Sequence, residues 1–427
     1  MTKTGYKMTE IGEIPEEWDA KKIRELKQNM YYGITAKATE ENTNLRMLRT
    51  TDIKNFKFNL NNLPFCEITE KRSDLSKYFL KRNDIIIARA GTVGVSILVE
   101  ENLNGTLFGS YLIKIIFKQE TINMKFIHYY FQSQLYWSNI SNAQGSTIKN
   151  INLPFLNSLE IPLPPLPEQQ KIAEILSAAD DEIQKVNEQI VLTEQLKKGL
   201  MQRLLTRGIG HTKFKMTEIG EIPEEWEIKK IKDISTYVTD GTHKTPHYIE
   251  EAQSGVPFIS TENIKPYSNE FDFSRYKRYI DEISYKELSK RAKPEKGDLL
   301  ISKCGTIGRT QLIRNDIKIG IFVGLLLVKI KNNTVSGQYF EDLLNSDKYR
   351  TIMESISPGS TRKTLAIGMF KNILIPLPPL QEQQKIAEIL TTVDNKLELL
   401  GNKREKLNVL KKGLMDDLLT GKVRVKV

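Results

Sequence analysis

The chain has 427 residues, of which 39% are hydrophobic and 27% are charged, and its formal net charge is +10. The length exceeds what one hydrophobic core usually serves, so we expect several domains in a soluble globular protein. We find neither a run of 18 apolar residues nor a signal peptide, and we therefore expect a cytoplasmic protein without membrane contact. The basic excess is compatible with a nucleic-acid partner, but solvated surface can carry the same charge.

The first element along the chain is a leader that occurs twice. Residues 7–18 and 215–226 have the same twelve-residue sequence, Lys-Met-Thr-Glu-Ile-Gly-Glu-Ile-Pro-Glu-Glu-Trp. Residues 161–176 and 375–390 agree at all but one position. The chain is thus one module written twice, with a period too long for a solenoid repeat. Built-in two-fold symmetry suits a two-fold partner, and duplex DNA is the commonest such partner in a cell.

Between the constant segments the two copies diverge, at residues 20–160 and 228–374. In each copy a Gly-Thr-x-Gly turn follows a strand, without the full dinucleotide-binding fingerprint, so we do not expect a nucleotide loop. Short β-rich runs alternate with helical stretches, which predicts an α+β fold for both variable segments. The predicted strands are 85–88, 111–116, 299–302 and 325–330, and the predicted helical stretches are 124–139 and 337–355.

The segment after each variable region predicts a long helix. Apolar residues recur every three or four positions through 168–206 and again in the second copy, in a heptad stripe with a slip near its middle. Pro-Leu-Pro-Pro-Leu forms a stiff entry to each helix, and Gly208 and Gly421 are suited to end them. Neither stripe has another long helix in its own module, so we predict an antiparallel coiled coil; the alternative is packing of each helix on its own domain. The predicted helix-pairing residues are Ile172, Leu176, Ile183, Val186, Ile190, Leu196, Leu200, Ile386, Leu390, Val393, Leu397, Leu400, Leu407, Leu410 and Leu414.

The sequence lacks the motifs of a catalytic site. It contains no P-loop and no Asn/Asp-Pro-Pro-Tyr/Phe motif of the kind with which amino-methyltransferases hold a base. His243 and His247 are four residues apart, but Pro246 lies between them and the first copy has no counterpart, so we predict no metal site. Cys66 and Cys304 occupy unmatched positions, which argues against a disulfide or metal site built into the module. The pattern favours a binding protein over an enzyme.

The duplicated motifs occur together in one known family. They are the Glu-Ile-Pro-Glu-Glu-Trp leader, Ile-Pro-Leu-Pro-Pro-Leu-x-Glu-Gln-Gln-Lys-Ile-Ala, the Asp-led strand before each Gly-Thr-x-Gly turn, and Asp240-Gly241-Thr242-His243. In this order, across essentially the whole chain, the sequence resembles the specificity subunit of type I restriction–modification systems. The first copy departs at the last motif, where it has Tyr32-Gly33-Ile34-Thr35.

The resemblance implies a fold and a role. The fold would be α+β, with two target-recognition domains separated by two long helices that form an antiparallel coiled coil in a pseudo-two-fold repeat. The subunit would be non-catalytic: it would recognise an asymmetric bipartite target in double-stranded DNA and direct two methyltransferase (modification) subunits, and through them restriction or translocase subunits, to it. Those partners would use S-adenosylmethionine, and ATP with magnesium, while this chain would bind no cofactor directly. The implied domains are 1–160 and 214–374, and the helical spacer regions are 161–213 and 375–427.

Two other functions remain as alternatives: a recognition subunit of another restriction class, and a two-headed adaptor that binds protein.

Loops on a rigid sheet are natural carriers of base-reading side chains, and we predict three DNA-binding loops in each copy. Positions that match between the copies are expected to contact phosphate or support the scaffold, and positions that differ, such as Thr35 against His243, to read bases. The alternative is that Gly-Thr-x-Gly and Gly-Ser-Thr are ordinary structural turns. The predicted DNA-binding residues are Thr35, Lys37, Arg49, Thr50, Thr51, Arg89, Thr92, Ser146, Thr147, Lys149, Thr239, Thr242, His243, Lys244, Thr245, Ser260, Thr261, Asn263, Lys303, Thr306, Ser360, Thr361, Arg362 and Lys363.

Overall fold

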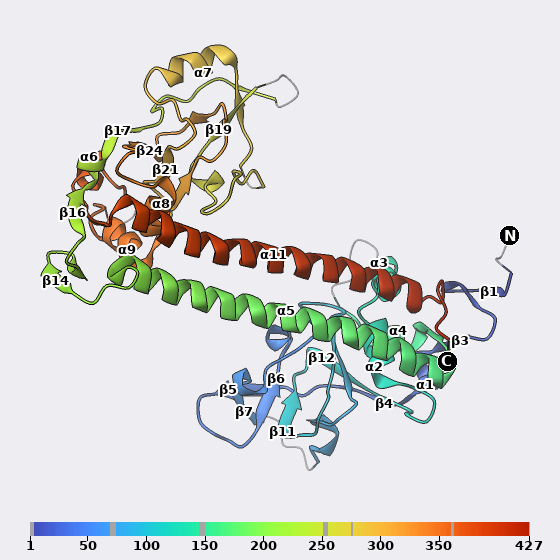
Figure 1. Cartoon of the computed structure of the whole chain (residues 1–427). Helices are drawn as coiled ribbons and strands as arrows, with labels where there is room; N and C mark the ends of the chain where they lie inside the picture. Colours follow the sequence, from blue (N-terminus) through green and yellow to red (C-terminus); the bar gives the residue numbers. More distant parts are fainter. Residues whose placement is uncertain are drawn as a thin grey trace. The chain divides into compact units, whose positions relative to one another are not determined.

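The computed structural model of the chain describes residues 4–68, 74–144, 150–250, 255–274, 276–359 and 363–426 (Figure 1). The chain forms two compact units, one of Met1–Asn187 with Asn402–Val427 and the other of Glu188–Gly401. Two long helices, α5 (Leu166–Arg207) and α11 (Leu380–Leu418), each contribute to both units. In the part of the chain that the structure describes, no helix is long and apolar enough to cross a membrane.

The first unit begins with the hairpin β1-β2 and contains two larger sheets, ordered β10-β9-β12-β4 and β5-β7-β6-β11-β8. The antiparallel pair β3-β13 ties the end of the leader to the strand just before α5. The strands are β1 (Tyr6–Thr9), β2 (Gly12–Pro15), β3 (Asp19–Lys22), β4 (Lys27–Tyr32), β5 (Ala36–Thr39), β6 (Arg46–Leu48), β7 (Phe65–Ile68), β8 (Phe79–Leu80), β9 (Ile85–Ala88), β10 (Ser96–Leu98), β11 (Leu103–Phe108), β12 (Leu112–Phe117) and β13 (Glu160–Leu163). The short helices are α1 (Ile23–Leu26), α2 (Met124–Tyr130), α3 (Gln134–Gln144) and α4 (Leu153–Ser158).

The second unit repeats this plan, which confirms the predicted internal repeat. Its hairpin β14-β15 and the pair β16-β25 correspond to β1-β2 and β3-β13, and its sheet β22-β21-β24-β17 has the strand order of β10-β9-β12-β4. A second four-stranded sheet has the order β18-β20-β19-β23. The strands are β14 (Phe214–Thr217), β15 (Gly220–Pro223), β16 (Glu227–Lys230), β17 (Ser235–Asp240), β18 (Tyr248–Ile249), β19 (Val256–Ile259), β20 (Tyr279–Ile280), β21 (Leu299–Ser302), β22 (Thr310–Leu312), β23 (Gly320–Ile321), β24 (Leu325–Ile330) and β25 (Leu374–Leu377). The short helices are α6 (Ile231–Ile234), α7 (Glu282–Ser289), α8 (Gly337–Asn345), α9 (Asp347–Ser355) and α10 (Ile367–Lys371).

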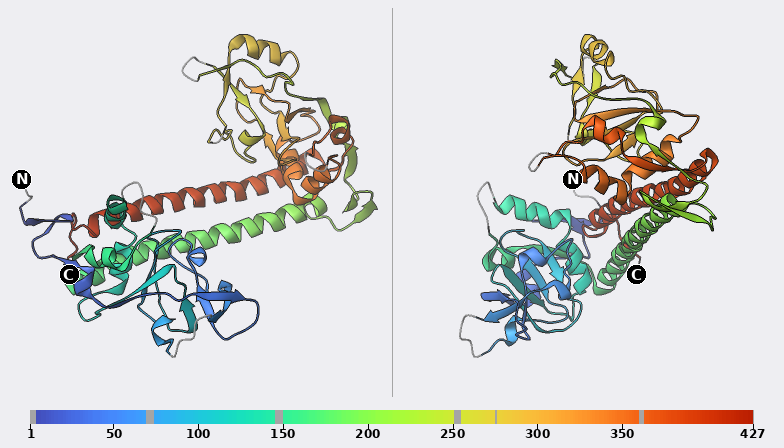
Figure 2. Two further views of the ribbon diagram at one scale, coloured as in Figure 1. Left: turned by 180° about the vertical axis from the view of Figure 1, so that it is seen from behind. Right: turned by 90° about the vertical axis from the view of Figure 1, so that its left-hand side faces the viewer.

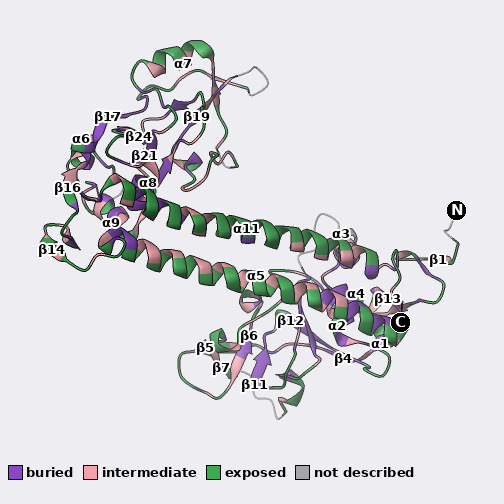
Figure 3. Ribbon diagram, viewed as in Figure 1, coloured by how far each residue is buried: buried purple, intermediate pink, exposed green. Residues whose placement is uncertain are grey.

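The four predicted strands are confirmed. Strands β9, β21 and β24 have the predicted bounds, and β12 begins one residue later than predicted. Every residue of β9 and β21 is buried, as the purple strands of Figure 3 show for β21. Ile85 and Ile87 face one hydrophobic cluster, and Ile86 and Ala88 face another. Because both faces of the strand are covered, it appears in the sequence as a continuous apolar run without alternation.

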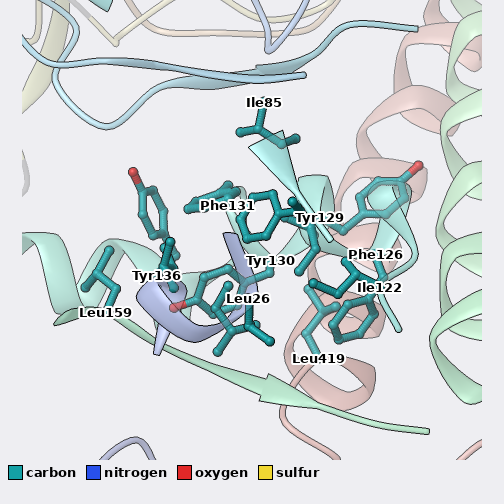
Figure 4. Packing of buried hydrophobic residues seen from close by; sticks show 14 of the residues in the cluster. Leu26, Ile85, Ile122, Phe126, Tyr129, Tyr130, Phe131, Tyr136, Leu159 and Leu419 are labelled. Carbon is teal, nitrogen blue, oxygen red and sulfur yellow. The ribbon is translucent and has the colours of Figure 1, made fainter. Parts of the chain in front are cut away.

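The larger core cluster of the first unit joins the sheet to the helices. Tyr130, Phe131 and Tyr136 pack edge-on or tilted against one another beneath Ile85 (Figure 4). Leu419, directly after α11, belongs to the same cluster. The end of the C-terminal helix is therefore part of the core of the first unit.

A tryptophan at the end of the first leader is anchored to the start of α5. The fully buried Trp18 donates a hydrogen bond from Nε1 to Glu168 Oε2 at 3.0 Å. Arg424, beyond the end of α11, donates from Nε to the other oxygen of Glu168 at 2.7 Å. Gly421, three residues beyond the last residue of α11, has a φ of +72°, and a Cβ atom there would lie 2.4 Å from Pro15. One carboxylate thus holds the leader, the first turn of α5 and the chain beyond α11 together.

The second unit contains the matching anchor. Trp226 Nε1 donates to Glu382 Oε2 at 3.0 Å, and His211 Nε2 pairs with Glu382 Oε1 at 2.9 Å. Gly208 ends α5 with φ of +63°, and a Cβ atom there would lie 2.7 Å from Trp226. Gly208 directly follows α5, as predicted for a helix stop, and Trp226 leaves no room there for a side chain. Gly421 lies three residues beyond α11, and Pro15 leaves no room there for a side chain.

A buried glutamine beside each glutamate attaches the variable domain to the helix. Gln169 accepts from the amide of Asn123 at 2.8 Å and donates to the carbonyl of Pro164 at 2.8 Å. Gln383 repeats both contacts, with the amide of Ser336 at 2.9 Å and the carbonyl of Pro378 at 2.8 Å. These bonds explain why Glu-Gln recurs at the start of both helices.

Within each unit the parts of α5 and α11 pack against one another and run antiparallel, as predicted (Figure 2). In the first unit Lys411 Nζ pairs with Asp180 at 2.7 Å, and in the second Lys197 Nζ pairs with Asp394 at 2.5 Å. The two pairs are equivalent, because 394 minus 180 and 411 minus 197 are both 214.

The predicted slip in the heptad stripe is wrong. Leu196 and Leu410 are each 55% exposed and do not lie between the helices. Thr193 and Lys197 take the inward positions in α5, so the 3-4 spacing continues without interruption. The side chain of Lys197 is only 12% exposed, because its aliphatic stem lies in the helix interface while its ammonium group meets Asp394.

The remaining predicted helix-pairing residues are covered to different degrees. Those that are buried are Ile172, Leu176, Val186, Ile386, Leu390 and Leu400. Those that are partly buried are Ile183, Ile190, Leu200, Val393, Leu397, Leu407 and Leu414.

Substitutions at Leu176 and Leu196 should separate buried from exposed positions of the stripe. Leu176→Ala should lower the free energy of unfolding by about 2–5 kcal/mol, because it opens a cavity in a core. Leu196→Lys should change it by less than about 0.5 kcal/mol, because its surroundings are solvent. Urea unfolding of the full chain, followed by helical circular dichroism, measures both. A large loss of stability in Leu196→Lys would contradict the corrected stripe.

Candidate nucleic-acid interface

The first variable domain brings several strand ends together at one edge. Gly33, after β4, lies so close to Gly109 that a Cβ atom on it would be 2.1 Å from the Gly109 carbonyl oxygen, so no side chain fits. The amide of Ile34 donates to the carbonyl of Phe108 at 3.0 Å, and that of Gly109 donates to the carbonyl of Leu48 at 2.9 Å. The ends of β4, β6 and β11 therefore meet.

Strand β9 delivers Arg89 to the same edge. The amide of Arg89 donates to the carbonyl of Tyr111 at 2.9 Å, and its carbonyl accepts from Ile151 at 2.9 Å. A Cβ atom on Gly91 would lie 3.7 Å from Thr50 Oγ1, so the Gly-Thr-x-Gly turn adjoins the 3-10 turn Thr50–Asp52. The structure thus brings together residues 49–52 and the turn after Arg89, which were predicted to form one DNA-binding site.

The second domain builds the corresponding edge. A Cβ atom on Gly241 would lie 2.2 Å from the carbonyl oxygen of Ile321, which again requires glycine. The amide of Lys303 donates to Gly324 at 2.8 Å, and its carbonyl accepts from Leu365 at 2.8 Å. The loops around 239–245, 303–306 and 363–365 converge here.

Asp240 is the centre of a charged cluster at this edge. Its side chain is 4% exposed, and it accepts hydrogen bonds from Lys303 Nζ at 2.5 Å and from the Arg291 guanidinium. His243 Nε2 lies 3.2 Å from the same carboxylate. Burial opposes the charged form of Asp240, but the hydrogen bonds from Lys303 and Arg291 outweigh it and lower its pKa. One ionised carboxylate therefore positions Lys303 and Arg291 at this edge.

The first domain holds its cation by different chemistry. Tyr32 occupies the position of Asp240, and Arg89 that of Lys303. The guanidinium carbon of Arg89 lies 4.6 Å from the centre of the Tyr32 ring, a cation–π contact. The two edges have the same backbone frame and different side-chain chemistry.

The prediction that Asn263 and Ser260 contact DNA needs correction. Asn263 is fully buried: its oxygen accepts from the amide of Ser260 at 2.8 Å, and its NH2 group donates to the carbonyls of Asp272 and Tyr276 at 2.7 and 2.6 Å. Its hydrogen-bonding capacity is used within the domain. Ser260 is buried and caps the 3-10 turn that Asn263 closes.

Thr239 and Thr242 are also buried, and Thr242 Oγ1 is hydrogen-bonded to the backbone of Lys244. These two hydroxyls support the loop and do not face solvent. Arg49 is exposed, but Asp52 accepts from its Nε at 3.0 Å and from its Nη2 at 2.8 Å, so its guanidinium is already paired.

That the other candidates contact DNA stays a prediction. The exposed ones are Thr35, Lys37, Thr51, Thr92, His243, Lys244, Thr245, Thr306 and Lys363, and the partly buried ones are Thr50, Arg89, Thr261 and Lys303. Ser146, Thr147, Lys149, Ser360, Thr361 and Arg362 lie outside the described residues.

Two residues at these edges were missed by the sequence prediction. Tyr111 is 65% exposed beside Arg89, although the sequence prediction placed it in a strand. Arg291 reaches Asp240 from 51 positions further along the chain, and the sequence contains no signal that joins them.

The chain matches a family model over most of its length. The model for the type I restriction modification DNA specificity domain matches residues 7–194 and again residues 223–409. A relative from Methanocaldococcus jannaschii, provisionally named the type I restriction enzyme MjaX specificity subunit, is 30% identical over 433 residues, covering 99% of this chain and 97% of that protein. The type I restriction enzyme EcoBI specificity subunit of Escherichia coli is 23% identical over 362 residues, covering 81% of this chain and 75% of that protein.

Solved structures show the same fold. A crystal structure of the type I restriction–modification S subunit from M. genitalium superimposes with a TM-score of 0.55 at 17% identity, covering 98% of this chain and 99% of that one. A chain from a study of complex assembly in the type I restriction–modification system gives a TM-score of 0.60 at 16% identity, covering 96% and 99%.

The chain therefore belongs to the type I restriction–modification DNA specificity family. Its role is DNA target recognition, as the non-catalytic component of such a system.

Replacement of Asp240 tests its role as the centre of the cluster. Asp240→Asn should lower the stability of the second unit by about 1–3 kcal/mol at neutral pH, because Lys303 loses a charged hydrogen-bond partner. Since folding lowers the pKa of Asp240, this contribution is full above the unfolded value of about 3.9 and is lost as pH falls through the lower folded value. The measurement is urea unfolding of the wild type and the variant across pH, with Asp316→Asn, an exposed carboxylate, as control. Equal stability of Asp240→Asn and wild type at pH 7 would refute the role.

Proposed function

We propose that the chain recognises an asymmetric, bipartite target in double-stranded DNA, with one half read by each variable domain. The proposal is carried by one observation: matched positions on the same frame hold Tyr32 with Arg89 in one domain and Asp240 with Lys303 in the other. Side chains with different donors and geometry discriminate different base edges. The two long helices would act as the spacer that separates the halves.

We further propose that two copies of a methyltransferase subunit dock on the long helices. Leu196 and Leu410 are equivalent, and both are exposed. Gly199 and Gly413 lie three residues further on, and nothing described in the structure comes within 4 Å of a Cβ atom added to either. A glycine inside a helix costs about 1 kcal/mol relative to alanine, and no contact among the described residues accounts for it. A partner that approaches the helix closely at two equivalent places would account for both the leucine and the glycine.

The methyltransferase subunits would supply S-adenosylmethionine chemistry and would in turn bind restriction or translocase subunits that use ATP with magnesium. This chain would hold none of these cofactors itself. We place the complex in the cytoplasm, where the DNA of a bacterial or archaeal cell is accessible to it.

Exchange of the variable segments tests the asymmetric target. A chain in which 20–160 and 228–374 are exchanged should methylate the same two half-targets in the opposite order, because each domain carries its own readers. Sequencing of methylated sites in cells that express the wild-type or exchanged chain with its partner subunits measures this. A palindromic wild-type target, or a target that the exchange leaves unaltered, would refute the assignment.

Charged substitutions on the helices test the docking sites. Leu196→Lys and Leu410→Lys should each reduce the number of bound methyltransferase subunits from two to one, and the double variant should bind none. Native mass spectrometry of the co-expressed complex counts the subunits. Leu192→Lys is the matched control, because Leu192 is 64% exposed on α5 but its equivalent in α11 is Lys406. Loss of a subunit in the control, or retention of both in the double variant, would contradict this location.

A further inference from the structure

Two arginines lie at the edge of the first variable domain, and their surroundings differ. Arg49 is held by both oxygens of Asp52, so its guanidinium would have to break an ion pair to meet DNA. Among the residues that the structure describes, no carboxylate pairs with Arg89. Within the described structure Arg89 therefore retains its full charge and its terminal donors.

Arg89 is also held in place. Its backbone is bonded on both sides, to Tyr111 and Ile151, and its guanidinium is stacked on Tyr32. Its Nε is buried without a hydrogen-bond partner in the described structure, so the free donors are the two terminal nitrogens. A stacked guanidinium loses little conformational freedom when it forms a pair of parallel hydrogen bonds.

We propose that Arg89 reads a guanine in the half-target of the first domain, with its terminal nitrogens on guanine O6 and N7. Guanine is the base that presents two acceptors side by side in the major groove, and the arginine fork matches that pair. The proposal rests on the proposed function of this edge and deepens it by naming the base.

The matched position in the second domain does not have this capacity. Lys303 has no fork, and its ammonium already donates to Asp240. The guanine assignment therefore belongs to the first domain alone, and Arg89 is a determinant of the asymmetry of the target.

The experiment uses the full chain in complex with its methyltransferase subunits and a duplex that carries the target found by methylation sequencing. Wild type should prefer guanine over other bases at one position of the first half-target by about 5- to 150-fold, the range that a bidentate contact provides. Arg89→Ala and Arg89→Lys should both lose this preference and keep the base preferences at the other half-target. Replacing that guanine with 7-deazaguanine, which lacks the N7 acceptor, should weaken wild-type binding and leave Arg89→Ala unaffected.

The control is Arg82→Ala, which removes the same charge near the opposite end of β9. This variant should leave the base preference at every position of the target unchanged. A first half-target without guanine on either strand would overturn the proposal. So would an Arg89→Lys variant that keeps the preference, or an Arg89→Ala variant that binds all sequences more weakly by one factor, since the latter describes a phosphate contact. Absence of any preferred sequence for the wild-type complex would instead refute the proposed function.

Discussion

The hydrogen bond between a leader tryptophan and the glutamate in the first turn of a long helix is the contact on which each unit depends. Glu168 joins the leader, the start of α5 and the segment beyond α11, and Glu382 makes the same junction in the second unit. A buried carboxylate depends on its hydrogen-bond donors, and a hydrogen bond to a charged group contributes about 1.5–3 kcal/mol. The leader and the helix starts are therefore coupled, and neither can change without the other.

The glutamine that follows each glutamate extends this constraint to the variable domain. Gln169 and Gln383 each fasten a loop of their domain to the first turn of the helix by the same two hydrogen bonds. The frame is therefore fixed from the helix side by backbone contacts that do not depend on the residues at the reading edge. This separation lets one frame carry Tyr32 with Arg89 in one copy and Asp240 with Lys303 in the other.

The sequence predicted the features that come from repetition and from the pattern of apolar residues: two copies, four strands and antiparallel pairing of the helices. It failed where polar residues take structural positions. Leu196 looked like the interface residue because leucine is more apolar than lysine, yet the stem of Lys197 fills that place and its charge is met by Asp394. Asn263 fits a base reader and a turn cap equally well in sequence, and only its burial decides between them. The link from Arg291 to Asp240 depends on tertiary structure, which no local pattern encodes.

The two ways of holding a cation have different electrostatic consequences for DNA. The Tyr32 ring fixes Arg89 without neutralising it, so the approach of a base or a phosphate meets a full positive charge. Asp240 fixes Lys303 and Arg291 but brings a negative charge that remains ionised at neutral pH, because those cations lower its pKa. The Asp240 carboxylate is 4% exposed and is already paired with these two cations, so an approaching phosphate or base would meet the cations, whose positions the carboxylate fixes. The second edge is therefore suited to discriminate by geometry and charge together, and the first by the fork of one arginine.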